Sequence, residues 1–97
     1  MGNKEGPSTK YYPEGIIAEV IYWQNNLKNG IWKQFYEDST LRLASNYLMD
    51  QLNGTYRVYN RKQIIVLDGI YKNGEMDGDW KFYDTEGNLK RVLQYRD

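Results

Sequence analysis

The sequence predicts an all-β fold: an open antiparallel β-meander of about eight short strands, made of four 24-residue hairpin repeats in one twisted layer. Three observations predict it. Glycines recur every 24 residues, turn signals fall about 12 residues apart, and the segments between turns are rich in β-branched and aromatic residues without helical spacing. A small closed β-barrel is the alternative.

The repeat is visible as columns of equivalent residues, one residue per 24-residue step. The glycine column begins at Gly6, and a second column begins at Tyr11. The three columns that we assign to the structure of the repeat contain Gly30, Gly54 and Gly78; Trp32, Tyr56 and Trp80; and Tyr47, Tyr71 and Tyr95. The chain is therefore expected to be a single domain over 1–97, with repeats at approximately 6–29, 30–53, 54–77 and 78–97. Residues 1–5 are expected to be disordered.

The turns follow in order along the chain. They are expected at 14–15, 25–26, 38–39, 49–50, 62–63, 73–74 and 86–87. Asn73-Gly74 is the strongest signal, because both central positions of a type I′ turn need a positive φ. Strands are expected between consecutive turns.

Turn positions also predict the register of the strands. A two-residue turn at 73–74 pairs Tyr71 with Met76, Leu67 with Trp80 and Ile65 with Phe82, and a turn at 86–87 pairs Trp80 with Leu93. All of these residues then share one face. The same arithmetic sets a tyrosine opposite a strand glycine in each repeat: Tyr47 with Gly30, Tyr71 with Gly54 and Tyr95 with Gly78. We expect a side chain at these glycines to collide with the tyrosine ring.

An apolar face of this kind needs a cover in a one-layer sheet. Strong coiling of the sheet, a second copy of the chain stacked on it, or a binding partner could supply the cover. Homo-oligomers through a sheet face or a sheet edge are therefore among the expected assemblies.

The opposite face carries the candidate binding residues. An aromatic column and a basic column lie side by side there, and their members are Phe35, Tyr59, Tyr83, Lys33, Arg57 and Lys81. Aromatic rings beside cations can stack on a partner's side chains, on sugars or on bases. The structural alternative is a cross-strand ladder whose cations keep the sheet soluble.

Composition excludes several functions. The chain has neither histidine nor cysteine, so the usual hydrolase triads and thiolate or imidazole metal sites cannot form, and we expect no catalytic residue, metal or cofactor. Thirteen basic residues balance thirteen acidic ones, which argues against nucleic acid as a partner. A cytoplasmic location is expected, with export as the alternative if a native leader is missing.

The pattern Tyr-x-Asn-Gly-x-x-x-Gly-x-Trp-x-x-Tyr, carried by Tyr71, Asn73, Gly74, Gly78, Trp80 and Tyr83, resembles the bacterial variant of the MORN repeat. The match is strong in the last repeat and weaker around Gly54. It departs at Ser39 and Gln63 in one set of turns, and at Asn26 and Asp50 in the other, so wider or bulged turns are expected there. Choline- and glucan-binding cell-wall repeats share the mixture of Gly, Trp and Tyr.

The resemblance implies an interaction module, and many bacterial relatives are antitoxin-like or immunity-like. From the residues and the resemblance together we expect a non-enzymatic module that binds a partner protein through the aromatic and basic face or a sheet edge. A carbohydrate or cell-wall binder and a lipid head-group binder are the alternatives, so membrane association stays open.

Overall fold

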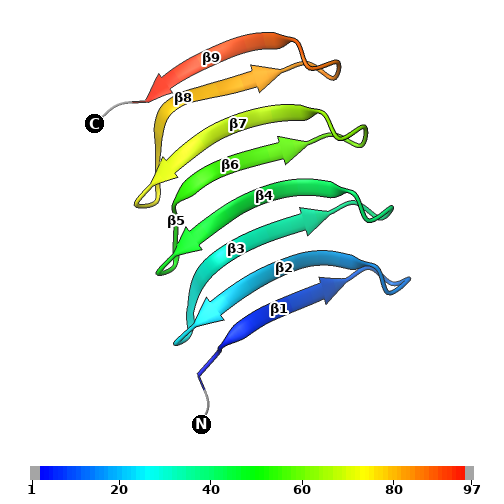
Figure 1. Cartoon of the computed structure of the whole chain (residues 1–97), viewed down its shortest axis with the longest axis vertical. Coiled ribbons are helices and arrows are strands. Elements are labelled where there is room, and N and C mark those ends of the chain that lie inside the picture. The colour runs from blue at the N-terminus through cyan, green and yellow to red at the C-terminus, as the bar shows by residue number, and fades with distance from the viewer. Residues whose placement is uncertain (1–2, 96–97) are drawn as a thin grey trace.

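The computed structural model describes residues 3–95 and shows one layer of antiparallel strands, 48 × 39 × 12 Å in extent (Figure 1). The strands are β1 (Gly6–Tyr11), β2 (Ile17–Gln24), β3 (Leu27–Phe35), β4 (Leu41–Leu48), β5 (Gln51–Leu52), β6 (Gly54–Tyr59), β7 (Ile65–Lys72), β8 (Glu75–Tyr83) and β9 (Leu89–Tyr95). The strand order in the sheet is β1-β2-β3-β4-β6-β7-β8-β9, and the short β5 pairs with β4. The predicted meander is confirmed, whereas the alternative of a closed barrel is wrong, because β1 and β9 lie at opposite ends of the sheet.

The ninth strand arises from a break within one of the eight predicted strands. β5 and β6 together correspond to the single strand β3 or β8 of the other repeats. Both pair with β4, and Asn53, which lies between β5 and β6, interrupts the pairing. No described residue lies in a helix, and so none belongs to a helix that could cross a membrane.

Two kinds of turn alternate along the chain, at the predicted places. Three are two-residue turns with positive φ at both central residues, at Asn25-Asn26, Met49-Asp50 and Asn73-Gly74. Four are wider turns that span residues 12–16, 36–40, 60–64 and 84–88, each closed by the same pair of backbone hydrogen bonds. The left-handed residue of each wider turn is Gly15, Ser39, Gln63 or Gly87. The turns at Ser39 and Gln63 are wider and have a register shift beside them, as expected, but Gly15 and Gly87 form the same turn. The wider or bulged turns expected at Asn26 and Asp50 are wrong, because both residues lie in two-residue turns.

The predicted register is partly right. The structure pairs Gly30 with Tyr47, Gly54 with Tyr71 and Gly78 with Tyr95, and it also pairs Tyr71 with Met76 and Trp80 with Leu93. The predicted pairing of Leu67 with Trp80 is wrong, because Leu67 lies opposite Phe82. A bulge of two residues between Asp77 and Lys81 shifts the register there, and a shift of the same size lies beside Gly30.

The bulges give the glycine column a different physical reason from the one expected. Gly54 has φ +99°, and a side-chain carbon added to it would meet only the Cβ atom of Asn46, at 3.9 Å. At Gly78, with φ +68°, such an atom would meet nothing within 4 Å. The expected collision with the tyrosine ring is therefore wrong. Glycine is favoured at these positions because the bulge needs a left-handed backbone.

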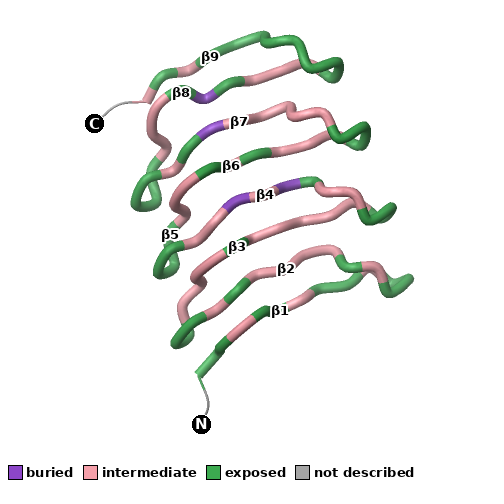
Figure 2. Tube along the Cα trace, in the orientation of Figure 1, coloured by how far each residue is buried: buried purple, intermediate pink, exposed green. Residues whose placement is uncertain are grey.

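A continuous stack of rings forms the core on one face of the sheet, which we call the ring face. Tyr56 contacts Trp32, Tyr71 and Trp80 with ring centroids 6.2, 5.4 and 5.7 Å apart. Trp80 is the most deeply buried, with 2% of its surface exposed. The few buried residues lie on β4, β7 and β8 (Figure 2). The rings thus cover one another, so part of the expected cover comes from within the layer.

Gly69 is the glycine that makes room for a ring. A side-chain carbon at Gly69 would lie closer than 3.0 Å to three atoms of the Trp80 indole, and its φ is not in the left-handed region. The indole therefore lies directly on the backbone of β7, while its Nε1 donates a hydrogen bond to the carbonyl oxygen of Ile70 at 3.1 Å. A glycine outside the repeat columns carries the role that was expected of Gly54.

The segment before β1 is joined to the first two-residue turn. The backbone N–H of Lys4 donates to the side-chain oxygen of Asn26 at 2.7 Å, and the N–H of Asn25 donates to the Glu5 carboxylate at 3.1 Å. Disorder was expected for residues 1–5; of these, residues 1 and 2 lie outside the described part of the chain.

Candidate functional site

A single row of residues crosses the whole sheet on the face opposite the rings. Directly paired neighbours define it from β1 to β9: Thr9, Val20, Lys33, Ala44, Arg57, Asp68, Lys81 and Val92. Side chains alternate between faces along a strand, so the residues next to Trp32, Tyr56 and Trp80 point away from the rings. We call this line of residues the basic row. It places the three cations that the sequence singled out on every second strand.

The cations of the basic row are not equivalent. Two strand spacings separate neighbouring cations, about 10 Å. Arg57 Nε donates to the Asp68 carboxylate at 3.1 Å, and this hydrogen bond, together with the charge of Asp68, raises the pKa of the guanidinium. Lys33 and Lys81 make no ion pair among the described residues. The row therefore offers two unpaired ammonium groups on either side of a partly neutralised arginine.

An apolar strip runs beside the basic row, close to the wider turns. Phe35 pairs with Leu41 and Tyr59 with Ile65, and Tyr83 pairs with Leu89 in the last hairpin. Directly paired residues share a face, so this strip lies on the same side as the basic row. The sequence placed Ile65 on the ring face; that placement is wrong, because a bulge in each hairpin shifts the register by one residue at this point.

The apolar strip is partly open to solvent. Leu89 is 53% exposed, and Tyr11, which is equivalent to Phe35 in the first repeat, is 62% exposed. A shallow hollow of about 250 Å³ lies beside Phe35 and is lined by Ile16, Ile17, Phe35 and Ser39. Ile17 and Leu89 are thus exposed at the two ends of the apolar strip, and the half-buried residues between them border the cations: Phe35, Leu41, Tyr59, Ile65 and Tyr83.

A wide hollow lies on the same face, toward the C-terminal half of the sheet. It has a volume of about 760 Å³, and its charged lining residues are Arg57, Asp68, Asp77, Asp79 and Lys81. The mixture of both signs suits hydrogen bonding to polar side chains better than binding of a purely anionic group. No group of three or more acidic, His or Cys side chains within residues 3–95 is placed to hold a metal ion.

Comparison with known proteins identifies the repeat. The family model described as the MORN repeat variant matches residues 4–25, 28–48 and 76–97, about two thirds of the chain. The chain belongs to the MORN repeat variant family. No curated protein and no solved structure matches it.

The part of the chain between the matches keeps the MORN geometry. Residues 49–75 are not matched, yet Gly54, like Gly30 and Gly78, has a positive φ and lies opposite a tyrosine. MORN repeats are non-enzymatic modules that generally bind proteins or membranes. The family thus supports a binding role for the chain, without naming a partner or a surface.

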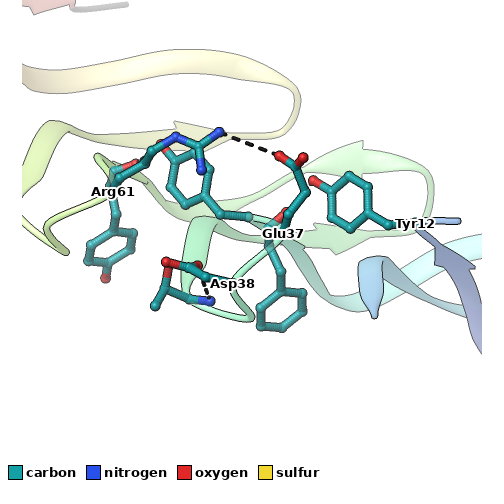
Figure 3. Close-up of polar contacts among 8 residues, drawn as sticks. Tyr12, Glu37, Asp38 and Arg61 are labelled. Carbon is teal, nitrogen blue, oxygen red and sulfur yellow. Dashed lines mark hydrogen bonds and ion pairs between the residues drawn. The ribbon is translucent and has the colours of Figure 1, made fainter. Parts of the chain in front are cut away.

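Two tyrosines that sequence reasoning missed hold neighbouring MORN hairpins together at the wider turns. The Tyr12 hydroxyl donates to the carbonyl oxygen of Phe35 at 2.7 Å, and the Tyr36 hydroxyl donates to that of Tyr59 at 2.6 Å. These bonds fix the backbone of two candidate binding residues. Figure 3 shows Tyr12 beside this region and the ion pair between Arg61 and Glu37, whose atoms are 3.5 Å apart. The column of 12 and 36 in the 24-residue repeat could have revealed them.

Asparagines connect neighbouring hairpins at the two-residue turns, on the side of the sheet opposite the wider turns. The side-chain oxygen of Asn29 accepts from the N–H of Met49, and that of Asn53 accepts from the N–H of Asn73, each at 3.1 Å. Glu5 plays the same part toward Asn25 in the first repeat. This column, too, has a 24-residue period and was overlooked because its members are polar and look like ordinary turn residues.

Proposed function

We propose that the chain is a non-enzymatic module that binds a partner protein through the basic row and the apolar strip beside it. The observation that carries the proposal is their adjacency: Lys33, Arg57 and Lys81 lie in one row, next to Phe35, Tyr59 and Tyr83. Interfaces between proteins combine apolar and aromatic anchors with a polar rim, and this face has both.

A protein fits this surface better than an anionic membrane or a nucleic acid. Asp68 partly neutralises Arg57, and the neighbouring hollow carries Asp77 and Asp79. Anionic lipid or phosphate backbones need a surface of one sign, whereas a protein partner can supply acidic and basic groups together. Acidic side chains about 10 Å apart, beside an apolar segment, would complement the row.

A capture experiment with matched variants tests the proposal. The chain is immobilised as the wild type, as the face variant Lys33→Glu/Lys81→Glu, and as the control Lys62→Glu/Lys72→Glu. The control changes the net charge by the same amount, on exposed residues in or beside turns. A partner protein should be retained by the wild type and the control, and lost from the face variant. Equal retention by all three would contradict the proposed surface.

Two further arms separate the alternative ligands. Co-sedimentation with anionic vesicles that falls as salt rises would favour lipid head groups, and glycan binding that Tyr59→Ala and Tyr83→Ala abolish would favour carbohydrate. From the family resemblance we further propose that the partner is a toxin that the chain neutralises. The captured protein should then be harmful when expressed alone and harmless together with the wild-type chain. A harmless partner would contradict this finer proposal and leave the binding surface standing.

A further inference from the structure

The outer edge of β9 lacks a ring that the interior of the sheet has at every equivalent position. Each ring of the column Trp32, Tyr56 and Trp80 follows a strand that carries an equivalent residue, at 24-residue steps: Ile21, Ser45 and Gly69. Ile21 pairs with Trp32. Gly69 lies under Trp80 and is buried, and Ser45, its equivalent on β4, is 7% exposed. Leu93 is the equivalent on β9, and it is only half-buried. Among the described residues no strand lies beyond β9 to supply the next ring.

The last tyrosine of the stack has one ring neighbour, as Tyr47 has, where Tyr71 has two. Tyr71 lies between two rings, with centroids 5.4 Å from Tyr56 and 5.1 Å from Trp80. Tyr95, its equivalent, contacts Trp80 alone among the described rings, at 6.5 Å. A ring placed over Leu93 by an added strand would contact Tyr95 as Trp80 contacts Tyr71. We call this position beside β9 the open slot.

The charge beside the open slot specifies a second residue of the added strand. A row on the ring face runs by direct pairing from Lys10 to Arg91, passing through Leu43 paired with Val58 and Leu67 paired with Phe82. Arg91 is exposed and makes no ion pair among the described residues. An added strand in the same register places the equivalent of Phe82 opposite Arg91. An acidic residue there would pair with the guanidinium.

A second copy of this chain fits the open slot poorly. Its β1 would bring Ser8 to the ring position and Lys10 opposite Arg91, so the ring would be missing and two like charges would meet. Pro7 on β1 is equivalent to Thr55 on β6, two repeats later. The carbonyl oxygen of Thr55 points to the preceding strand, β4, where it accepts a hydrogen bond from Ser45. The same direction at Pro7 is the outer edge of the sheet. Pro7 therefore presents a position without an N–H on the outer edge of β1, which weakens pairing with another strand.

We infer that the outer edge of β9 binds an extended segment of a partner protein that carries an aromatic residue, any residue, and then an acidic residue. The aromatic ring enters the open slot above Leu93 and beside Tyr95, and the acidic side chain pairs with Arg91. Backbone hydrogen bonds along β9 supply the affinity, as in other additions of a strand to a sheet edge. This interaction uses an edge and the ring face, so it is independent of the surface under Proposed function.

Peptides copied from the fold itself test the inference. The probe is a synthetic peptide with the sequence of residues 75–83, in which Phe82→Glu places the acid two residues after Trp80. Controls carry Phe82→Lys, or Phe82→Glu together with Trp80→Ala. Binding to the 97-residue chain is measured by titration, and hydrogen exchange locates the protected amides. The acidic peptide should protect β9 and bind roughly five- to ten-fold more tightly than the lysine peptide, and loss of the tryptophan should weaken it further.

A charge exchange on the protein makes the test reciprocal. Arg91→Glu should reverse the preference, so that the lysine peptide binds more tightly than the acidic one. Absence of binding, equal affinity for the two peptides, indifference to the loss of tryptophan, or protection outside β9 would each overturn the inference. End-to-end oligomers of the chain alone, seen by sedimentation, would also overturn it, because a second copy would then occupy the edge.

Discussion

Gly69→Ala is the substitution that probes the packing of this sheet most sharply. The backbone of Gly69 is outside the left-handed region, so alanine meets no conformational penalty there. Its added carbon would, however, lie closer than 3.0 Å to the Trp80 indole. The indole cannot simply move aside, because Tyr56, Tyr71 and Tyr95 surround it at centroid distances of 5.7, 5.1 and 6.5 Å. One methyl group should therefore disturb the whole ring stack.

The expected cost follows from overpacking in a well-packed core, which is typically about 1–3 kcal/mol. We expect Gly69→Ala to lower the free energy of unfolding by about 2 kcal/mol. For a domain of this size that corresponds to a fall in Tm of roughly 8–16 °C. Urea denaturation followed by tryptophan fluorescence and a thermal melt followed by circular dichroism measure both quantities.

A double-mutant cycle separates the collision from other effects of the methyl group. The equivalent pair one repeat earlier is Ser45 and Tyr56, a larger residue under a smaller ring. Gly69→Ser/Trp80→Tyr should copy that pair and recover part of the stability that Gly69→Ser alone loses. If Gly69→Ala left the melt unchanged, or if the double variant were simply the sum of its singles, the contact between Trp80 and the β7 backbone would be refuted.

Three further outcomes are expected. Tyr36→Phe removes the hydroxyl bond to the carbonyl of Tyr59 and should cost about 1 kcal/mol in urea denaturation; no change would show that the bond is unimportant. Ser39→Gly should stabilise the chain by roughly 1 kcal/mol, because Ser39 has φ +74°, and a lower Tm would contradict this. Partial burial alone would raise the pKa of Glu19, but hydrogen bonds from Gln34 and Trp32 lower it below 4.5. The wild type should therefore have a higher free energy of unfolding than Glu19→Gln at neutral pH, and this difference should shrink as the pH falls below 4.5. A difference that does not depend on pH would contradict this expectation.

The sequence predicted the period, the turns and the pairing of Tyr71 with Gly54, because hairpin turns set the register over short distances. It could not predict the two-residue bulge before Lys81, since a bulge changes which residues face each other without changing the repeat length. For that reason Gly54 was given a role that Gly69 performs. The single serine or glycine at positions 45 and 69 carries no periodic signal of its own.

The candidate site was predictable as a set of residues and less so as an electrostatic surface. Lys33, Arg57 and Lys81 follow from strand alternation, and the structure places them in one row. Arg57 pairs with Asp68 in the same register that pairs Gly54 with Tyr71, but the pairing alone does not say that the two side chains form an ion pair. The bulges beside the wider turns move Ile65 next to Tyr59, which creates the apolar strip.

The chemical shifts of the Gly69 α protons test the central claim most directly, namely that rings lying on bare backbone form the core of a one-layer MORN sheet. Because the Trp80 indole covers Gly69, both α protons should be displaced upfield by the ring current in a solution NMR spectrum of the wild type. They should return toward ordinary glycine values in Trp80→Leu. Ordinary values in the wild type would contradict the proposed packing.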